Sequence, residues 1–422
     1  MIDLSVQIEI GGSFVEVGSI TGTSYQDAVF SYSYEYLDNP HRQPISLALP
    51  LERINFDARS TKIFFDGLLP EGFTRESVAK AIKADSNDYI TILSELGGEC
   101  LGAIKIFNSL NRKVRPNYKP LSVSAIKALA KEGATNAASL VVESHLSLTG
   151  ASGKVGLYYD EKTGRWFLPA GEAPSTYIVK QSHIRYADIV INEQLCLLTA
   201  KKLGINVPES FIIETDPDLN DGDVLFATRR YDRTIDKNSR TIKGLPVPYR
   251  LHQEDFSQAL GIPANQKYEE SGGEYLKKMI EILRSFSANP IDDQMALWKI
   301  CVFNYLVGNT DNHLKNLSLL YSKDLSSVRL APAYDIISTK IYNNSSKDMS
   351  LGINGKYRII KITRDDFKFE SKHSGLGSKL AMSVFDYLKE QFVPALMVSA
   401  EELAGQGFKQ APVLAEKIAK AY

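Results

Sequence analysis

The chain has few cysteines, no long apolar run and no excess of charge of either sign. Its three cysteines are widely spaced and form no C-x-x-C pair, which excludes a disulfide framework and a zinc site of that type. No stretch approaches about 18 unbroken apolar residues, and residues 1–8 lack the basic and apolar regions of a signal peptide. The net charge of −1 argues against a surface that attracts polyanions everywhere. We therefore expect a reduced cytoplasmic protein without a membrane partner.

The first part of the chain has the pattern of short strands. Alternation from Leu4 to Ile10, followed by Phe14 to Val17, predicts an antiparallel hairpin. Aromatic residues then alternate at Phe30, Tyr32, Tyr34 and Tyr36, which predicts a half-buried strand, with an aromatic binding stripe as the alternative. Further on, we predict a helix from Asp88 to Leu96, a strand over 101–107 and a linker over 111–120.

The middle and end of the chain differ in pattern. Short strands are predicted over 153–159, 166–169, 177–180, 211–213 and 224–228, with one helix over 189–203. After residue 253 the pattern is mainly helical, and the helix over 290–307 is apolar on nearly every face and therefore buried. We divide the chain into a β-rich N-terminal subdomain (1–110), a nucleotide-binding lobe (111–252) and a helical lobe (253–422). The predicted class is α+β, a two-lobed protein-kinase-like fold.

The run from Gly308 to Asn316 is the most informative motif. It places Asp311 five residues before Asn316, the D-x-x-x-x-N spacing of a phosphotransferase loop, in which Asp orients the attacking hydroxyl and Asn holds magnesium. Asp335 follows at the end of an apolar run, where a kinase keeps its other metal ligand. His313 and Lys315 flank these positions, and a structural hydrogen-bonding role is the alternative for His313.

Weaker nucleotide signals precede this loop. Ser147 to Val155 is a small-residue turn that could hold phosphate, but it lacks a glycine at Leu148 and a hydroxyl at Val155, so it is not a P-loop. A plain β-turn is the alternative. Lys180 ends a predicted strand, and Glu193 on the next helix could pair with it; a solvated lysine is the alternative. The segment Arg229 to Arg233 follows another predicted strand, where a kinase has the hinge between its lobes whose backbone binds adenine. A surface loop is the alternative interpretation of this segment.

These signals occur in the order that a two-lobed kinase requires, and together they resemble the HipA family of serine/threonine kinases, the toxins of bacterial HipBA toxin–antitoxin pairs. The matching stretches are Leu69–Gly72, Gly98–Ala103, Ser147–Ala151, Tyr177–Lys180, Asn192–Glu193, Tyr231–Arg233, Gln253–Asp255, Gly308–Asn316 and Tyr334–Asp335.

The resemblance implies roles for particular residues of this chain. Asp311 would be catalytic, Asn316 and Asp335 would bind Mg²⁺, and Ser147 would be the autophosphorylation site whose modification switches the kinase off. The remaining ATP-binding residues would be Thr149, Gly150, Ala151, Ser152, Gly153, Lys154, Lys180, Arg229, Arg230, Tyr231, His313, Lys315 and Tyr334.

The resemblance also implies partners. It suggests ATP and Mg²⁺ as cofactors, an aminoacyl-tRNA synthetase as the phosphorylated protein, and growth arrest as the result. A small HipB-like DNA-binding antitoxin would join the kinase to operator DNA, and any DNA contact by this chain would be to the backbone. Two alternatives remain: a kinase of small molecules or lipid headgroups, and a mainly non-catalytic co-repressor bound to its antitoxin.

Overall fold

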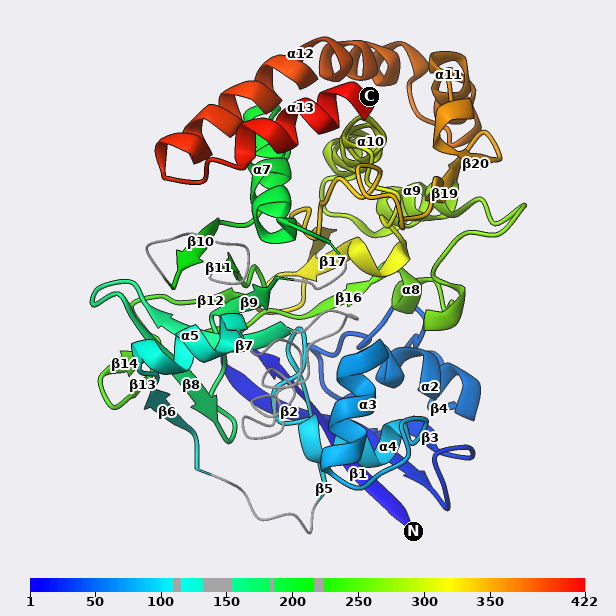
Figure 1. Cartoon of the computed structure of the whole chain (residues 1–422). Coiled ribbons are helices and arrows are strands. Elements are labelled where there is room, and N and C mark those ends of the chain that lie inside the picture. Colours follow the sequence, from blue (N-terminus) through cyan, green and yellow to red (C-terminus); the bar gives the residue numbers. More distant parts are fainter. Residues whose placement is uncertain (109–114, 132–153, 183–185, 216–223, 422) are drawn as a thin grey trace. The chain divides into compact units, whose positions relative to one another are not determined.

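The structure, a computed structural model of the chain, describes residues 1–108, 115–131, 154–182, 186–215 and 224–421 (Figure 1). The chain forms two compact units. Unit 1 comprises Met1–Gln181, Ala227–Ala264 and Leu320–Ser327, and unit 2 comprises Ser182–Phe226, Asn265–Leu319 and Val328–Tyr422. The predicted division after residues 110 and 252 stays a prediction.

The N-terminal part of unit 1 is a five-stranded sheet in the order β4-β3-β2-β1-β5. Its strands are β1 (Ile2–Ile10), β2 (Ser13–Gly22), β3 (Val29–Tyr32), β4 (Asn55–Phe56) and β5 (Ile104–Asn108). The predicted hairpin is confirmed, because β1 and β2 pair antiparallel from Ile2 opposite Gly22 to Ile10 opposite Ser13. Leu4, Val6 and Ile8 are buried, as their alternation requires.

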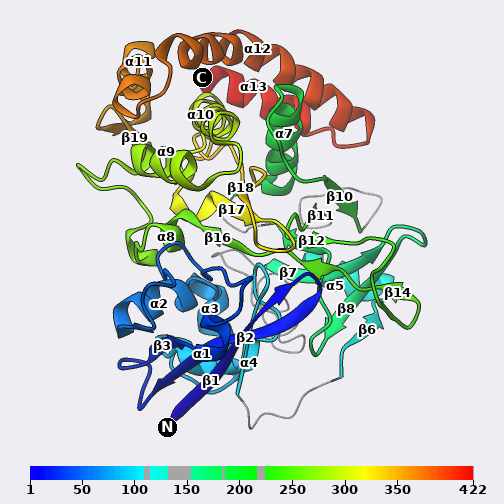
Figure 2. The same ribbon diagram turned by 180° about the vertical axis from the view of Figure 1, so that it is seen from behind.

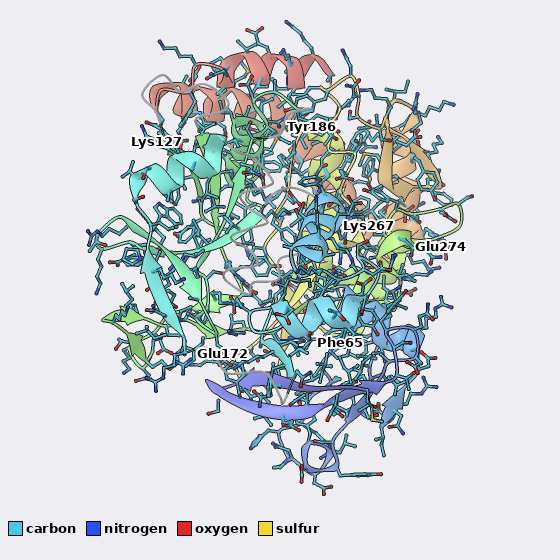
Figure 3. The ribbon with its side chains drawn as sticks, turned by 60° about the horizontal axis from the view of Figure 1, so that its bottom comes forward. Phe65, Lys127, Glu172, Tyr186, Lys267 and Glu274 are labelled. Atoms are coloured by element: carbon cyan, nitrogen blue, oxygen red, sulfur yellow. The ribbon has the colours of Figure 1, made fainter. Side chains whose placement is uncertain are left out.

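Four helices accompany this sheet: α1 (Tyr34–Leu37), α2 (Ala58–Asp66), α3 (Gly72–Ala81) and α4 (Tyr89–Leu96). Helix α4 confirms the predicted helix, since Asp88 caps it by accepting the Thr91 N–H at 3.0 Å. Phe65 of α2, labelled in Figure 3, packs against Phe30 of β3 with ring centroids 5.2 Å apart. This aromatic contact belongs to the core of the N-terminal part.

The predicted aromatic strand is wrong beyond Tyr32. Ser33 leaves the sheet and caps α1, because its hydroxyl accepts the Tyr36 N–H at 3.1 Å. The period of two is lost there, so Tyr34 is 74% exposed whereas Tyr36 is buried. Phe30 and Tyr32 pack edge to face in the core, which agrees with a buried sheet face and not with a binding stripe.

A second sheet of unit 1 contains the run β9-β7-β8-β6. These strands are β6 (Asn117–Pro120), β7 (Lys154–Asp160), β8 (Arg165–Ala170) and β9 (Tyr177–Gln181), and α5 (Val123–Lys131) follows β6. The predicted linker over 111–120 is therefore wrong at its C-terminal end, where Asn117 to Pro120 pair with β8. Tyr118 explains this, because its buried ring packs against that of Tyr158 with centroids 4.3 Å apart and planes tilted by 43°. Pro120 is tolerated on an edge strand.

The rest of unit 1 consists of short elements. They are β12 (Arg233–Thr234), β13 (Thr241–Ile242), β14 (Leu245–Pro246), β15 (Tyr249–Arg250), β16 (Gln253–Asp255) and α8 (Phe256–Ala259). Strand β11 (Val224–Arg229) begins in unit 2 and ends in unit 1. The predicted strand over 224–228 is thus confirmed.

Unit 2 is mainly helical, as predicted for the end of the chain. Its helices are α7 (Ile189–Lys202), α9 (Tyr275–Phe286), α10 (Pro290–Val307), α11 (Arg364–His373), α12 (Ser378–Gly405) and α13 (Ala411–Ala421). Its strands are β10 (Ser210–Glu214), β17 (Ser318–Tyr321), β18 (Val328–Leu330), β19 (Asp348–Ile353) and β20 (Lys356–Arg358), with 3-10 turns η2 (Ala264–Gln266), η3 (Leu314–Asn316) and η4 (Ile359–Lys361). Strand β17 ends, and η2 begins, in unit 1.

Helix α10 confirms the predicted buried helix. It starts at Pro290, which has no N–H to leave unsatisfied, and ends at Gly308. The long helices α12 and α13 lie side by side, and α7 and α10 lie beneath them (Figures 1 and 2). The Trp298 indole on α10 donates to the Ala381 carbonyl on α12 at 2.8 Å. The helix that leads into the D-x-x-x-x-N loop is therefore fixed in the centre of unit 2.

The cysteines are core residues, as expected. Cys100, Cys196 and Cys301 are buried and unbridged, and burial raises the pKa of each thiol to about 12. Across the described ranges, no helix is both long enough and apolar enough to cross a bilayer.

Candidate active site

The candidate catalytic loop begins where α10 ends. Gly308 has φ +72°, and a Cβ at this position would lie 2.8 Å from Cβ of Lys340. Both the left-handed backbone and the close approach therefore require glycine. The next residue, Asn309, donates to Oδ1 of Asn304 on α10 at 2.7 Å, and its own Oδ1 accepts the Asp311 N–H at 3.1 Å. These contacts position the start of the loop against the helix.

Thr310 holds the loop from the other side. Its N–H donates to the Thr339 hydroxyl at 2.7 Å, and the two threonine hydroxyl oxygens are also 2.7 Å apart. The Thr310 carbonyl accepts both the N–H and the hydroxyl of Ser350, at 3.1 and 2.7 Å. With every polar group of Thr310 occupied, the backbone next to Asp311 has little freedom.

Asp311 itself is exposed, and its carboxylate is oriented by a hydrogen bond. The Tyr268 hydroxyl donates to Oδ1 of Asp311 at 3.0 Å, and the Tyr268 ring meets His313 edge-on at 5.2 Å. The buried amide of Asn316 donates to the Asp311 carbonyl at 2.9 Å and so closes the D-x-x-x-x-N loop. An exposed, oriented carboxylate on a fixed backbone is the arrangement that positions a hydroxyl for attack.

The segment that carries Asp335 lies beside this loop. The Tyr334 hydroxyl donates to the Lys315 carbonyl at 2.9 Å and is 2.7 Å from the Ser318 hydroxyl, so residues adjacent to Asp335 and Asn316 are bonded to each other. Asp335 has φ +57°, an unfavourable backbone for a residue other than glycine. Such conformations persist where the surroundings impose them, and they cluster at functional sites.

The two predicted metal ligands fit a magnesium ion. The Asn316 amide nitrogen donates to Asp311, which leaves Oδ1 as the atom that can face a cation. A carboxylate and an amide oxygen, completed by phosphate oxygens and water, form the usual Mg²⁺ set of a phosphotransferase. In the described part of the chain, no three His, Cys, Asp or Glu residues are grouped to hold a metal by themselves.

In unit 1, two of the predicted phosphate ligands share one sheet face. Lys180 on β9 is directly opposite Lys154 on β7 in the antiparallel ladder, and Lys180 is buried. Residues directly opposite each other point to the same face, and two like charges there are unfavourable unless anions accompany them. Ser147 and residues 149–153 lie outside the described residues, and the pairing of Lys180 in unit 1 with Glu193 in unit 2 stays a prediction.

The predicted hinge residues differ in their surroundings. The Arg229 guanidinium is half exposed and lies 3.4 Å from the Glu161 carboxylate. The Arg230 guanidinium is buried among carboxylates and the Arg230 N–H donates to the Thr176 carbonyl, so at this position only the carbonyl could face a base. The Tyr231 hydroxyl donates to Oε1 of Gln253. The hinge assignment stays a prediction, and it concerns the main chain more than the side chains.

Sequence reasoning assigned no role to two residues of this site. Tyr268 bonds to Asp311, but no motif surrounds it, and its contact spans 43 residues. Asn192 on α7 accepts the Ser338 N–H at 3.0 Å and donates to the Ser338 carbonyl at 3.1 Å, which fixes the segment after Asp335. Asn192 belongs to one of the stretches that resemble the HipA family, and it is a polar residue in the middle of an apolar helix, but neither signal indicated its contact with Ser338.

Replacing Tyr268 by phenylalanine should reduce phosphoryl transfer about five- to tenfold, because one hydrogen bond to the Asp311 carboxylate is worth roughly 1–1.5 kcal/mol. The ring would remain against His313, so folding should not change. Turnover measurements at saturating nucleotide check this. Tyr275→Phe is the matched control, since its hydroxyl donates to the Gln266 carbonyl and does not touch Asp311. Equal rates in both variants would contradict an orienting role for Tyr268.

Comparison with known proteins agrees with this geometry. A family model of the HipA N-terminal domain matches residues 11–107, and a HipA-like C-terminal domain matches residues 146–396. The chain is 31% identical over 371 residues to the protein named "Putative kinase Y4mE" of Sinorhizobium fredii, which covers 86% of this chain and 84% of that protein. It is 24% identical over 325 residues to the serine/threonine-protein kinase toxin HipA of Shewanella oneidensis, covering 74% and 71% of the two chains.

A solved structure shares the fold. A chain in the complex of HipA, HipB and operator DNA from Shewanella oneidensis superposes with a TM-score of 0.77 and 19% identity, over 99% of this chain and 96% of that one. This similarity confirms the predicted α+β fold of the two-lobed, protein-kinase-like type.

Proposed function

The chain belongs to the HipA family of kinases, and we propose that it transfers the γ-phosphoryl group of ATP to a serine or threonine hydroxyl of another protein. The observation that carries this proposal is the exposed Asp311 carboxylate, oriented by Tyr268 and tied through its carbonyl to Asn316. The substrate hydroxyl would attack the γ-phosphorus and pass its proton toward Asp311, while the bond to the ADP oxygen breaks. The products are ADP and a phosphoprotein.

The other residues would bind and orient the nucleotide. Lys154 and Lys180 place two positive charges on one sheet face, which would counter the charge of the phosphates. Asn316 and Asp335 would hold Mg²⁺, whose chemistry when bound is to neutralise charge on the phosphate oxygens. His313, Lys315 and Tyr334 would support this loop, and the backbone of Arg229 to Tyr231 would serve the adenine.

The proposed protein substrate is an aminoacyl-tRNA synthetase, as the family resemblance suggests. The test is to incubate the purified chain with Mg·ATP and a set of purified synthetases, beside an Asp311→Asn control, and to map phosphosites by mass spectrometry. Phosphate on serine or threonine of one synthetase with the wild type alone supports the proposal. Transfer only to metabolites or lipid headgroups would favour the competing small-molecule kinase.

The proposed partner is a small DNA-binding antitoxin that joins this chain to operator DNA. The support is the fold shared with a chain from the complex of HipA, HipB and operator DNA of Shewanella oneidensis. Co-expression with a HipB-like antitoxin and a gel-shift assay on the operator DNA of that antitoxin test this. The competing co-repressor role predicts that Asp311→Asn still represses the operator, and that cells producing this variant grow as cells producing the wild type do. That result would contradict the kinase proposal.

We also propose that Ser147 is the site of self-inactivation. A phosphate of about two negative charges there would repel the phosphates of ATP. Ser147→Ala should therefore retain full activity during prolonged incubation with Mg·ATP, whereas the wild type loses activity as it becomes phosphorylated. Time courses of substrate phosphorylation measure this. If Ser147→Ala instead loses ATP affinity before any phosphorylation, Ser147 is a binding residue of the loop.

A further inference from the structure

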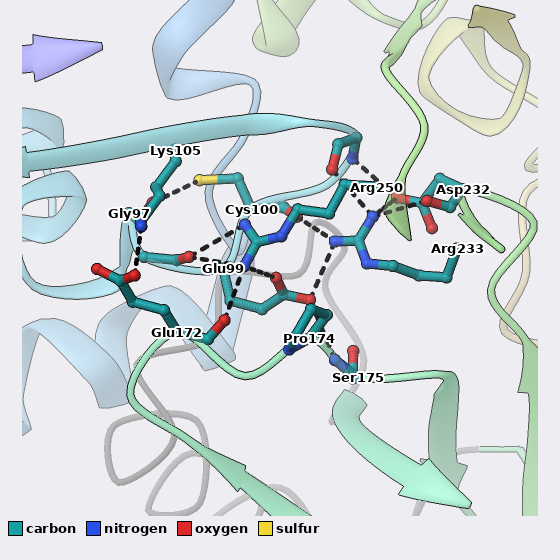
Figure 4. Close-up of polar contacts among 12 residues, drawn as sticks. Gly97, Glu99, Cys100, Lys105, Glu172, Pro174, Ser175, Asp232, Arg233 and Arg250 are labelled. Atoms are coloured by element: carbon teal, nitrogen blue, oxygen red, sulfur yellow. Dashed lines mark hydrogen bonds and ion pairs between the residues drawn. The ribbon is translucent and has the colours of Figure 1, made fainter. Parts of the chain in front are cut away.

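Unit 1 contains a buried network of ionised groups (Figure 4). It joins two carboxylates, Glu99 and Asp232, to three guanidinium groups, those of Arg230, Arg233 and Arg250, and all five side chains are at most 3% exposed. Burying so many charges is costly unless each is paired and hydrogen-bonded. Nothing in the proposed phosphoryl transfer uses these groups directly, so the network needs a separate explanation.

Glu99 is the shared acceptor of this network. Its Oε1 lies 3.1 Å from the Arg230 guanidinium and 3.0 Å from that of Arg233, and it accepts the Ser175 N–H at 3.2 Å. Its Oε2 lies 2.7 Å from Arg250. The three arginines hold the pKa of the Glu99 carboxyl below its usual range, although burial opposes this. One carboxylate thus binds three cations that come from two separate stretches of the chain.

The turn around Glu99 is bound to the same arginines through its backbone. Arg233 donates to the Cys100 carbonyl and the Gly102 carbonyl, both at 2.9 Å, and the Gly102 N–H donates to Asp232 at 2.8 Å. Gly102 has φ +70°, and a Cβ there would lie 2.8 Å from the Gln253 N. The turn is therefore hydrogen-bonded to the 230–233 segment and packed closely against Gln253, so that a shift of the turn would also displace the 230–233 segment.

The 230–233 segment also includes part of the predicted adenine hinge. The Arg230 N–H donates to the Thr176 carbonyl at 2.9 Å, one residue before β9 begins, the strand that carries Lys180. Glu99 belongs to the stretch that matches the HipA N-terminal domain, whereas Arg230, Asp232 and Arg233 belong to the stretch that matches the C-terminal domain. The N-terminal domain is therefore bound through Glu99 and its turn to the 230–233 segment, which includes part of the proposed hinge.

We propose that Glu99 is a positioning residue for nucleotide binding: it fixes the main chain of Arg230 and Tyr231 through the buried guanidinium groups, so that the N-terminal domain sets the affinity for the adenine end of ATP. This inference rests on the proposed kinase function. It assigns the N-terminal domain a part in nucleotide binding, because a displaced hinge would lose its backbone contacts with the base.

The test is Glu99→Gln, compared with the wild type for KM of ATP, for kcat and for the dissociation constants of ATP and AMP. A displaced hinge weakens the adenine contacts of both nucleotides, so we expect KM for ATP to rise about tenfold or more, AMP binding to weaken by the same factor, and kcat to change little. A control is Asp66→Asn, which breaks a partly buried ion pair with Arg75 in the same unit and should leave KM for ATP unchanged.

Loss of a buried carboxylate could instead act by unfolding the protein, and a double variant separates the two effects. Three positive and two negative groups leave a net charge of +1 in the network, and Glu99→Gln combined with Arg250→Met preserves that value. The double variant should regain thermal stability but keep the raised KM for ATP, because Arg230 and Arg233 still lack the negative charge of the Glu99 carboxylate and keep only Asp232 as an ionic partner. Recovery of KM together with stability would overturn the proposal.

The outcomes also separate this inference from the proposed function. If the wild type binds no ATP, the kinase proposal fails first. If the wild type binds ATP, and a folded Glu99→Gln protein or the folded double variant binds ATP and AMP as tightly, the kinase proposal stands and the positioning role of Glu99 is wrong. A variant that weakens ATP but not AMP would place the defect at the phosphates and would likewise contradict a hinge role.

Discussion

Replacing Asp311 by asparagine is expected to lower phosphoryl transfer about a thousandfold, the range lost when a positioned general base is removed. Asparagine has the same shape and can still accept the Tyr268 hydroxyl, so the loop should keep its conformation. It cannot take a proton or carry the negative charge that orients the substrate hydroxyl. The measurement is the initial rate of phosphate transfer at saturating Mg·ATP.

Two controls make this result specific. The dissociation constant for ATP and the circular dichroism spectrum should match the wild type, because Asp311 is exposed and asparagine has the same shape. Asp324→Asn removes another exposed loop aspartate, which accepts the Ser322 hydroxyl at 2.7 Å, and its transfer rate should be unaffected. A folded Asp311→Asn protein with the wild-type rate would remove Asp311 from the mechanism.

Replacing Asp335 by asparagine should reduce activity at millimolar Mg²⁺ by at least about 100-fold. The loss of a direct metal ligand should exceed the usual effect of losing a residue that only hydrogen-bonds to a ligand. The substitution is chosen for its backbone: Asp335 has φ +57°, and asparagine tolerates the left-handed region as well as aspartate does. The loss should therefore reflect metal binding and not strain. Titration of activity with Mg²⁺ and with Mn²⁺ measures it.

The metal dependence has its own control. Asp188 also lies in the left-handed region, at φ +56°, and is not a predicted metal ligand, so Asp188→Asn should leave the Mg²⁺ titration unchanged. The Asp335→Asn variant should recover part of its activity at high metal concentration, and a chelator should abolish wild-type activity. A chelator-insensitive wild type would contradict a role for Asn316 and Asp335 as metal ligands.

Local patterns in the sequence predicted much of unit 2. The helix over 290–307 was predicted with the observed bounds, and its start is marked by proline and acidic first-turn residues, which are local signals. The D-x-x-x-x-N loop was predicted for the same reason: its closing bond joins Asn316 to Asp311, five residues apart. Contacts between residues that are close in the chain can be predicted from the sequence alone.

The features that were not predicted include one local helix cap and several contacts between distant residues. Tyr34 and Tyr36 continue an alternating pattern, but the Ser33 cap converts the strand into a helix turn. Asn117 to Pro120 have the sequence of a linker, but the contact of Tyr118 with the distant Tyr158 places them in a strand. The Glu99 network joins residues about 130 positions apart, and no periodic pattern in the sequence predicts such ion pairs. Charged residues are usually exposed, so composition alone suggests a surface loop there.

The most direct test of Asp311-dependent phosphoryl transfer is phosphosite mass spectrometry on the protein incubated with Mg·ATP, beside the Asp311→Asn variant. The account predicts phosphate on a serine or threonine, with Ser147 the expected site, in the wild type alone. Phosphate at equal occupancy in both proteins, or none in a wild type that binds ATP and is offered its synthetase substrates, would contradict it.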